Sequence, residues 1–99
     1  CNVFIVQDES VITPPLDVEK LPGVTRNMLI DILRGQDWRV EERAITRREV
    51  TNADEVWLTS STKEIAPVID IDGQSVADGK PGPVWAEAQS LFARHRFSA

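Results

Sequence analysis

Short apolar runs separated by polar turns predict strands in the first half of the chain. Residues 3–6 and 11–13 form two such runs about a hairpin apart, and the Pro14-Pro15 pair ends the second one. Residues 38–43 alternate apolar and charged side chains, which is typical of a half-exposed strand.

Two more strands and a hairpin are predicted in the second half. Residues 54–59 form the first strand, and residues 65–71 form the second, which Pro67 interrupts. The Asp72-Gly73 pair that follows is the strongest short hairpin signal in the sequence. Together these patterns predict about six strands.

Three segments have the spacing or the boundary residues of helices. Between Pro22 and Gly35, apolar residues recur at helical spacing, and the glycine is placed to end the helix. Thr46 and Glu49 form a capping-box pattern that predicts a short helix, and a last helix is predicted at residues 84–96. The pattern as a whole predicts a mixed α/β fold with three helices.

The composition is that of an ordinary globular domain. Of the 99 residues, 41% are hydrophobic and 27% are charged, and the formal net charge of -5 gives no general attraction to nucleic acid or to anionic membranes. Cys1 and His95 are the only cysteine and histidine, so the sequence offers neither an internal disulfide nor a metal site. A cytoplasmic location is therefore expected, without membrane insertion, because the apolar runs are too short to span a bilayer.

The beginning of the chain affects how its domain is interpreted. Cys1 stands directly before a predicted buried strand, with no initiator methionine and no loose polar residues ahead of it. We therefore interpret residues 1–99 as a single partial domain, the C-terminal segment of a longer protein.

Residues 21–26, with the sequence Leu-Pro-Gly-Val-Thr-Arg, form a turn that leads directly into a helix N-terminus. The first backbone N–H groups of a helix have no partner within the helix, and the helix dipole favours an anion there. Val24 and Thr25 could donate their amides, and Thr25 its hydroxyl, to a bound phosphate. Taken alone, the segment is more simply an ordinary helix start, in which Pro22 and Gly23 fix the turn and Thr25 caps the helix.

A cluster of hydroxyl side chains at residues 59–62 follows the strand predicted at 54–59. Ligands of α/β proteins gather at the C-terminal ends of strands, and hydroxyls bind them without adding charge. A solvated loop is the simpler interpretation of this segment alone. A serine hydrolase is poorly supported, since the motif G-x-S-x-G is absent and His95 is the only candidate base.

The other chemically capable residues are predicted to be structural or solvated. The tryptophans are expected in the core or an interface, the lysines in solvated loops, two aspartates in a turn, and two acidic residues opposite arginines on a solvated face. In that order they are Trp38, Trp57 and Trp85; Lys20, Lys63 and Lys80; Asp70 and Asp72; and Glu41 and Glu42, answered by Arg43, Arg47 and Arg48.

Several motifs occur in an order and at distances that together resemble the signature of the class IV aminotransferases. The motifs are residues 2–4, 11–13, 21–26, 53–68 and 79–83, so the resemblance covers nearly the whole chain. These enzymes are the fold-type IV pyridoxal-phosphate (PLP) enzymes, and they include D-amino-acid, branched-chain and aminodeoxychorismate members. The resemblance implies the C-terminal part of the large, cofactor-binding domain of such an enzyme.

The resemblance also implies how the cofactor phosphate is held. Backbone amides of Val24 and Thr25, in the turn formed with Gly23, would bind the phosphate, and Leu21 would pack on the pyridine ring. The hydroxyl of Ser61 would bind the phosphate as well.

Three further positions carry implied roles. Ser60 would face the cofactor, Thr62 would face the substrate carboxylate, and Asn2 would lie near the floor of the pocket. The lysine that forms the Schiff base and the glutamate that pairs with the pyridine nitrogen would both precede Cys1, so no residue of the chain is assigned a catalytic role and no metal site is expected.

The function implied is that of part of a PLP-dependent transaminase, which contributes the cofactor-phosphate half-site. Its substrates would be an amino acid and a 2-oxo acid. D-amino acids are favoured, because the sequence of residues 60–64 is most similar to that of D-amino-acid aminotransferases. A branched-chain aminotransferase or an aminodeoxychorismate lyase remains an alternative. The complete enzyme would be a homodimer, and the 99 residues alone would be inactive without the N-terminal part. A hypothesis from another class is a non-catalytic module that retains the fold.

Overall fold

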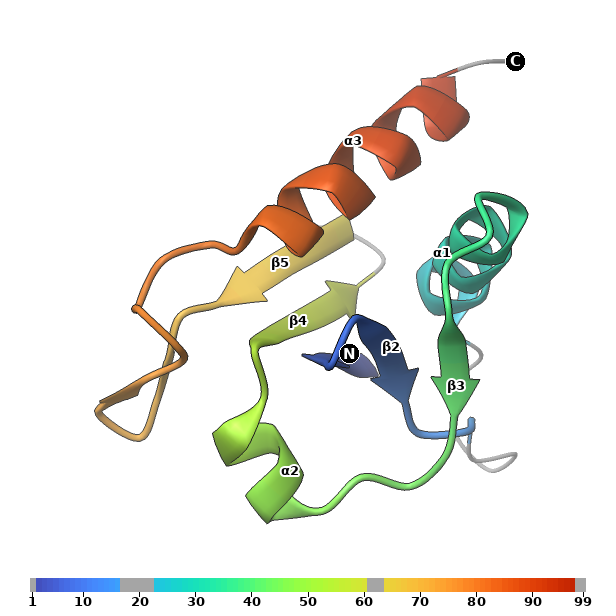
Figure 1. Ribbon diagram of the computed structural model, residues 1–99. Coiled ribbons are helices and arrows are strands. Elements are labelled where there is room, and N and C mark those ends of the chain that lie inside the picture. Colours follow the sequence, from blue (N-terminus) through green and yellow to red (C-terminus); the bar gives the residue numbers. More distant parts are fainter. Residues whose placement is uncertain (1, 17–22, 61–63, 98–99) are drawn as a thin grey trace.

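A five-stranded mixed sheet forms the centre of the molecule in the computed structural model, which describes residues 2–16, 23–60 and 64–97 (Figure 1). The strand order is β3-β2-β1-β4-β5; β2 and β3 are parallel, and the other neighbours are antiparallel. The strands are β1 (Asn2–Gln7), β2 (Ser10–Thr13), β3 (Val40–Glu42), β4 (Glu55–Ser60) and β5 (Glu64–Val68). A separate hairpin follows, formed by β6 (Asp70–Ile71) and β7 (Gln74–Ser75).

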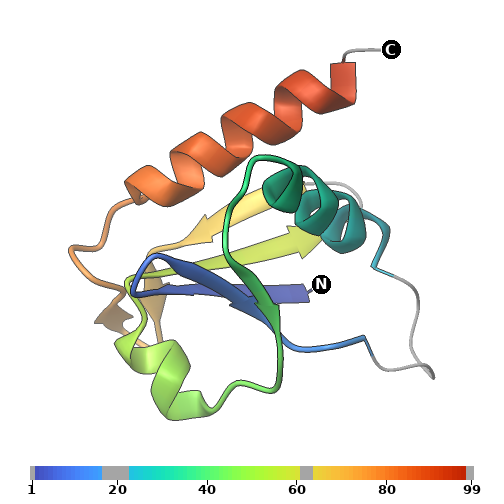
Figure 2. The same ribbon diagram turned by 45° about the vertical axis from the view of Figure 1, so that its right-hand side comes forward.

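Helices cover the sheet unequally on its two faces. The helices are α1 (Val24–Gly35), α2 (Arg47–Asn52) and α3 (Pro83–Phe97). Figure 2 shows α1 and α3 together over one face, with α2 and the β6–β7 hairpin on the other. None of the helices in the described part of the chain is long and apolar enough to cross a membrane.

The main core lies between the sheet and the two longer helices. Successive side chains of a strand point to opposite faces, so Phe4 and Val6 of β1 face α1 and α3, while Ile5 between them faces α2. Trp57 of β4 is fully buried and stacks on Phe4, with ring centroids 6.1 Å apart. Leu29 of α1 belongs to the same buried cluster, so the helical spacing of apolar residues in the sequence marks the face of α1 that packs on the sheet.

The predicted elements are confirmed, with one difference in the count of strands. The described residues contain three helices as predicted, but seven strands rather than about six. Pro67 does not interrupt the strand predicted at 65–71; it lies within β5, opposite Trp57 of β4, and the break comes at Ile69. The strand tolerates proline because β5 is at the edge of the sheet, where one side of the backbone needs no partner.

Helix α2 begins with the capping box that the sequence predicts. The Thr46 hydroxyl accepts a hydrogen bond from the Glu49 amide at 3.1 Å, and the Glu49 carboxylate accepts one from the Thr46 amide at 3.0 Å. Arg43 Nη2 donates to Glu49 Oε2 at 2.8 Å. The hydrogen bond from Arg43, with that from the Thr46 backbone, lowers the pKa of Glu49 to about 2.

Acid is therefore expected to weaken the start of α2. A carboxyl whose pKa is lower in the folded than in the unfolded state stabilises the fold above its unfolded pKa, and this contribution disappears as the pH falls through its folded pKa. For Glu49 the window runs from about pH 5 down to about pH 2. Thermal melts should show the full-length protein melting above its Glu49→Gln variant near neutral pH, with the difference shrinking through this window. A difference independent of pH would contradict the assignment.

Candidate functional site

The predicted site residues in the described part of the chain lie along one end of the sheet. Asn2 begins β1 and pairs with Thr59 of β4, and the Thr59 hydroxyl donates to the Asn2 carbonyl at 3.4 Å. Ser60 is the last residue of β4. Figures 1 and 2 both show the start of β1 and the tip of β4 on the side of the sheet where α1 begins.

Gly23 joins the helix start to this end of the sheet. It is the N-cap residue of α1 and is buried against Asn2. A Cβ at position 23 would lie 2.9 Å from Asn2 Oδ1 and 3.0 Å from Arg26 Cβ, so only glycine allows this approach without a shift. The close packing places the helix N-terminus beside Asn2.

The start of α1, in the described part of the chain, presents backbone amides without a side-chain cap. Among the described residues, no side chain caps the helix, and the residue before it is Gly23 rather than a hydroxyl residue. Thr25 lies inside the first turn, so it does not cap the helix as the ordinary interpretation of this segment requires. Val24 is 66% exposed. The amides and the helix dipole together form a site that is suited to an anion.

Three of the predicted ligand residues, Leu21, Ser61 and Thr62, lie outside the described residues, as do Lys20 and Lys63. The structure therefore brings together Asn2, the start of α1 and the end of β4. The ligand roles assigned to all of these residues stay predictions.

Comparison with known proteins identifies the family. The model of the family described as amino-transferase class IV matches residues 1–71. The chain belongs to the class IV aminotransferases.

Relatives and solved structures agree with this membership. The chain is 37% identical to a D-alanine aminotransferase of Bacillus licheniformis over 92% of its own length and 32% of the relative's. A branched-chain amino acid aminotransferase of Escherichia coli superposes with a TM-score of 0.87 at 35% identity, over 94% of this chain and 31% of that one. An aminotransferase from Brucella abortus, bound to the cofactor PLP, superposes with a TM-score of 0.86 at 29% identity, over 95% and 32%. The chain thus spans about a third of the length of these proteins.

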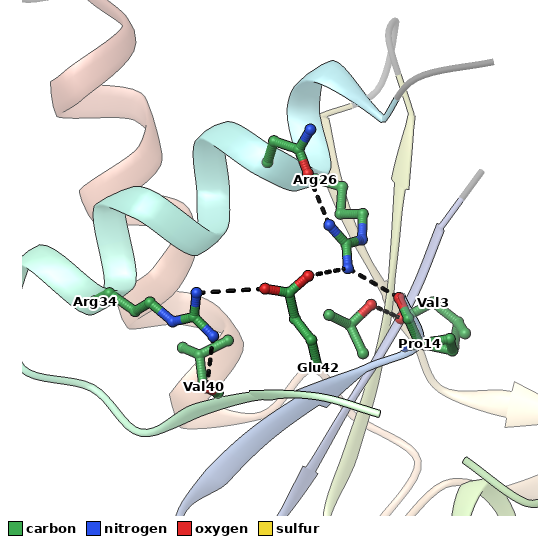
Figure 3. Close-up of polar contacts among 8 residues, drawn as sticks. Val3, Pro14, Arg26, Arg34, Val40 and Glu42 are labelled. Carbon is green, nitrogen blue, oxygen red and sulfur yellow. Dashed lines mark hydrogen bonds and ion pairs between the residues drawn. The ribbon is translucent and has the colours of Figure 1, made fainter. Parts of the chain in front are cut away.

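The sequence analysis assigned no role to one buried, positively charged side chain beside the candidate site. Arg26, in the first turn of α1, is only 2% exposed, and its guanidinium forms an ion pair with Glu42 at the end of β3, with Nη2 and Oε2 2.9 Å apart (Figure 3). This hydrogen bond is the main cause that lowers the pKa of Glu42. The signal was present, because Arg26 precedes Leu29, Ile30 and Leu33 at the spacing of the buried helix face.

The acidic pair at 41 and 42 departs in part from its predicted partners. Glu41 lies 3.7 Å from Arg43, as predicted, but Glu42 pairs with Arg26 and Arg34 of α1. Arginines close in sequence are not the only possible partners of an acidic residue. Strand β3 lies beside β2 and under α1, so Glu42 meets two arginines of α1 that are 8 and 16 positions away in the sequence.

The remaining predictions for chemically capable residues are confirmed where the structure describes them, except that for Asp70. Trp57 is buried, and Trp38 and Trp85 pack against the main core. Asp72, Lys80 and His95 are exposed, and Asp72 lies in the turn as predicted. Asp70 is exposed too, but it begins strand β6 and pairs with Ser75 instead of forming the turn.

A cavity of about 400 Å³ lies away from the predicted site, between α2 and the β6–β7 hairpin. This region adjoins the residues that lead into β4, whereas the predicted ligand residues lie where β4 ends. The cavity is open and of mixed polarity, and it is lined by Arg47, Val50, Thr51, Ile71, Asp72, Gln74, Ser75 and Val76. Its position separates it from the cradle at the start of α1.

Proposed function

We propose that the chain is part of a PLP-dependent aminotransferase and that it contributes the phosphate half of the cofactor site. The observation that carries the proposal is the uncapped start of α1, packed through Gly23 against Asn2. The family membership and the PLP-bound Brucella abortus neighbour support the same cofactor. Because the chain spans about a third of its relatives, the activity proposed is that of the complete protein.

The residues present fit a phosphate group. A phosphate dianion needs several N–H or O–H donors at close range, and first-turn amides with nearby hydroxyls supply them without a charged clamp. Val24 and Thr25 would donate their amides, and Gly23 provides the close approach that a side chain would block. Ser61 and Leu21 would add a hydroxyl and a packing surface for the ring.

The chain's own residues would bind and orient rather than react. When bound, PLP supplies the electron sink for the transfer of an amino group between an amino acid and a 2-oxo acid. Ser60 would line the cofactor side of the site, Thr62 would bind the substrate carboxylate, and Asn2 would form the floor. The lysine and the glutamate of the signature would come from the part of the protein that precedes Cys1.

We propose D-amino acids as the substrates, because of the sequence of residues 60–64 and the similarity to D-alanine aminotransferases. The branched-chain relatives and structures favour an alternative, the transamination of branched-chain L-amino acids. Transamination rates of the full-length protein with D-alanine and with L-leucine distinguish the two. We further propose a cytoplasmic homodimer, and a monomeric mass in light scattering would contradict the assembly.

Replacing Thr25 with alanine should weaken PLP binding by about tenfold, as expected from the loss of one hydrogen bond to a charged group. The measurement is equilibrium binding of PLP to the full-length protein, followed by the visible-edge absorbance that survives dialysis. Thr51→Ala is the matched control, because the Thr51 hydroxyl donates to the Arg47 carbonyl within α2, away from the predicted site.

Two outcomes would count against these assignments. Unchanged affinity in Thr25→Ala would remove the Thr25 hydroxyl from the site. A full-length wild-type protein that retains no PLP would contradict the proposed function and would leave the non-catalytic module as the better hypothesis.

A further inference from the structure

We infer that Arg26 is a positioning residue that fixes the start of α1 as a rigid anion cradle. The inference rests on the proposed function, since the anion is the cofactor phosphate. It concerns the guanidinium group, to which the sequence assigned no role.

The guanidinium of Arg26 ties three segments of the chain together. Nη2 donates to the Pro14 carbonyl and to Glu42 Oε2, each at 2.9 Å, and Nη1 donates to Asn27 Oδ1 at 2.7 Å. Figure 3 shows the side chain reaching from α1 toward the chain after β2 and toward Glu42. The first turn of α1 is thereby held against the ends of two neighbouring strands.

The same side chain packs directly on the N-cap residue. The position that a Cβ of Gly23 would occupy lies 3.0 Å from Arg26 Cβ, 3.2 Å from Arg26 Cδ and 2.9 Å from Asn2 Oδ1. Gly23 therefore packs closely against both Arg26 and Asn2. A shift of the Arg26 side chain would move the residue from which the open amides begin.

Glu42 anchors both ends of α1 through one carboxylate. Oε2 accepts from Arg26 in the first turn, and Oε1 accepts from Arg34 in the last turn at 3.3 Å. The two contacts differ in weight, because Arg26 is 2% exposed whereas the Arg34 side chain is 47% exposed. Exposed pairs contribute little. Loss of Glu42 would leave the buried Arg26 guanidinium without its charged partner, so the Arg26 contact dominates although Glu42 itself is 37% exposed.

One donor of Arg26 remains unused. Nε is buried and has no hydrogen-bond partner among the described residues. It is bonded to Cδ, the atom that packs beside Gly23, so this part of the cation lies next to the helix start. Because Glu42 pairs with the same guanidinium, the charges of the two groups largely cancel, and Arg26 acts on the helix start through its position and packing.

The test compares PLP with pyridoxal, which lacks the phosphate, as ligands of the full-length protein. Arg26→Gln should weaken PLP binding by about tenfold and leave pyridoxal binding within about twofold, so the preference for the phosphorylated ligand falls. Arg34→Gln is the matched control, because it removes the other partner of Glu42, and it should keep the preference within about twofold.

A second variant keeps the test decisive if Arg26→Gln does not fold. Glu42→Gln retains an acceptor for Arg26 but removes the charge that holds it, and it should lower the same preference in the same direction. Variants of Arg26 and Glu42 that melt earlier but keep the full preference for PLP would show a merely structural role and would overturn the inference, with the proposed function intact. A wild-type protein without any preference for PLP over pyridoxal would overturn both.

Discussion

Replacing Glu55 with alanine should lower the free energy of unfolding of the full-length protein by roughly 2 to 4 kcal/mol, because three donors lose a buried acceptor. Glu55 opens β4 and is 8% exposed. Its Oε1 accepts hydrogen bonds from the Trp85 amide at 2.7 Å and from the Trp57 indole at 3.0 Å, and its Oε2 accepts from the Val84 amide at 2.9 Å. The carboxylate thus caps α3 from a neighbouring strand, where the helix dipole favours a negative charge.

Chemical denaturation of three variants isolates this cap. Glu55→Gln keeps one oxygen acceptor and should lose less stability than Glu55→Ala. Glu87→Ala removes an exposed carboxylate from α3 itself and should change the free energy by no more than about 0.5 kcal/mol. An equal loss in Glu55→Ala and Glu87→Ala would mean that the cap contributes nothing.

A substitution at Gly82, the residue before α3, gives a second test of the same carboxylate. A Cβ at position 82 would collide with the Glu55 carboxyl, so Gly82→Ala should be destabilising in the wild type and much less so in the Glu55→Ala background. Additive losses would contradict a shared cause.

Elements that depend on adjacent residues could be predicted from the sequence. The Asp72-Gly73 turn has both central φ angles positive, at 51° and 83°, and this requirement is visible in the two residue types alone. The capping box of Thr46 and Glu49 is equally local, since its partners are three positions apart. Local chemistry of this kind determines an element without reference to the rest of the fold.

Contacts between distant residues account for what the sequence did not predict. Glu55 shares a strand face with Trp57 and Thr59, so the sequence alone could show that a charged residue faces the core. Its helix partners could not be predicted, because they are 29 and 30 positions away in the sequence. Arg26 likewise stood on a buried helix face, and its partner Glu42 is 16 positions away. In both cases the sequence indicates a charged side chain on a buried face, but only the fold shows which distant residue it pairs with.

The candidate site depended on both kinds of information. The resemblance to a family supplied ligand roles for residues 2, 21, 23–25 and 60–62. The sheet then explains why the described members of this set lie together, because antiparallel pairing of β1 with β4 places Asn2 opposite Thr59, and Gly23 packs on Asn2. Neither periodicity nor composition could have given that adjacency, since it requires the register of two strands and the position of a helix.

Replacing Trp57 with alanine should have the largest effect on stability, about 3 to 5 kcal/mol, because it opens a cavity in the main core. The side chain is fully buried, stacks on Phe4 and donates its indole N–H to Glu55. Thermal and chemical denaturation of the full-length protein measure the loss. Leu58→Ala is the matched control, since Leu58 is the next residue of β4 and is 40% exposed.

The Trp57→Phe variant separates the two contributions of this side chain. Phenylalanine keeps an aromatic ring against Phe4 but cannot donate to Glu55, so it should recover much of the lost packing and leave the carboxylate with its two helix donors. Since β4 ends at Ser60, three residues beyond Trp57, loosening the strand in Trp57→Ala should also weaken PLP binding, whereas Trp57→Phe should bind PLP nearly as the wild type does. A Trp57→Ala protein as stable as Leu58→Ala would show that the sheet and the two long helices are held together elsewhere.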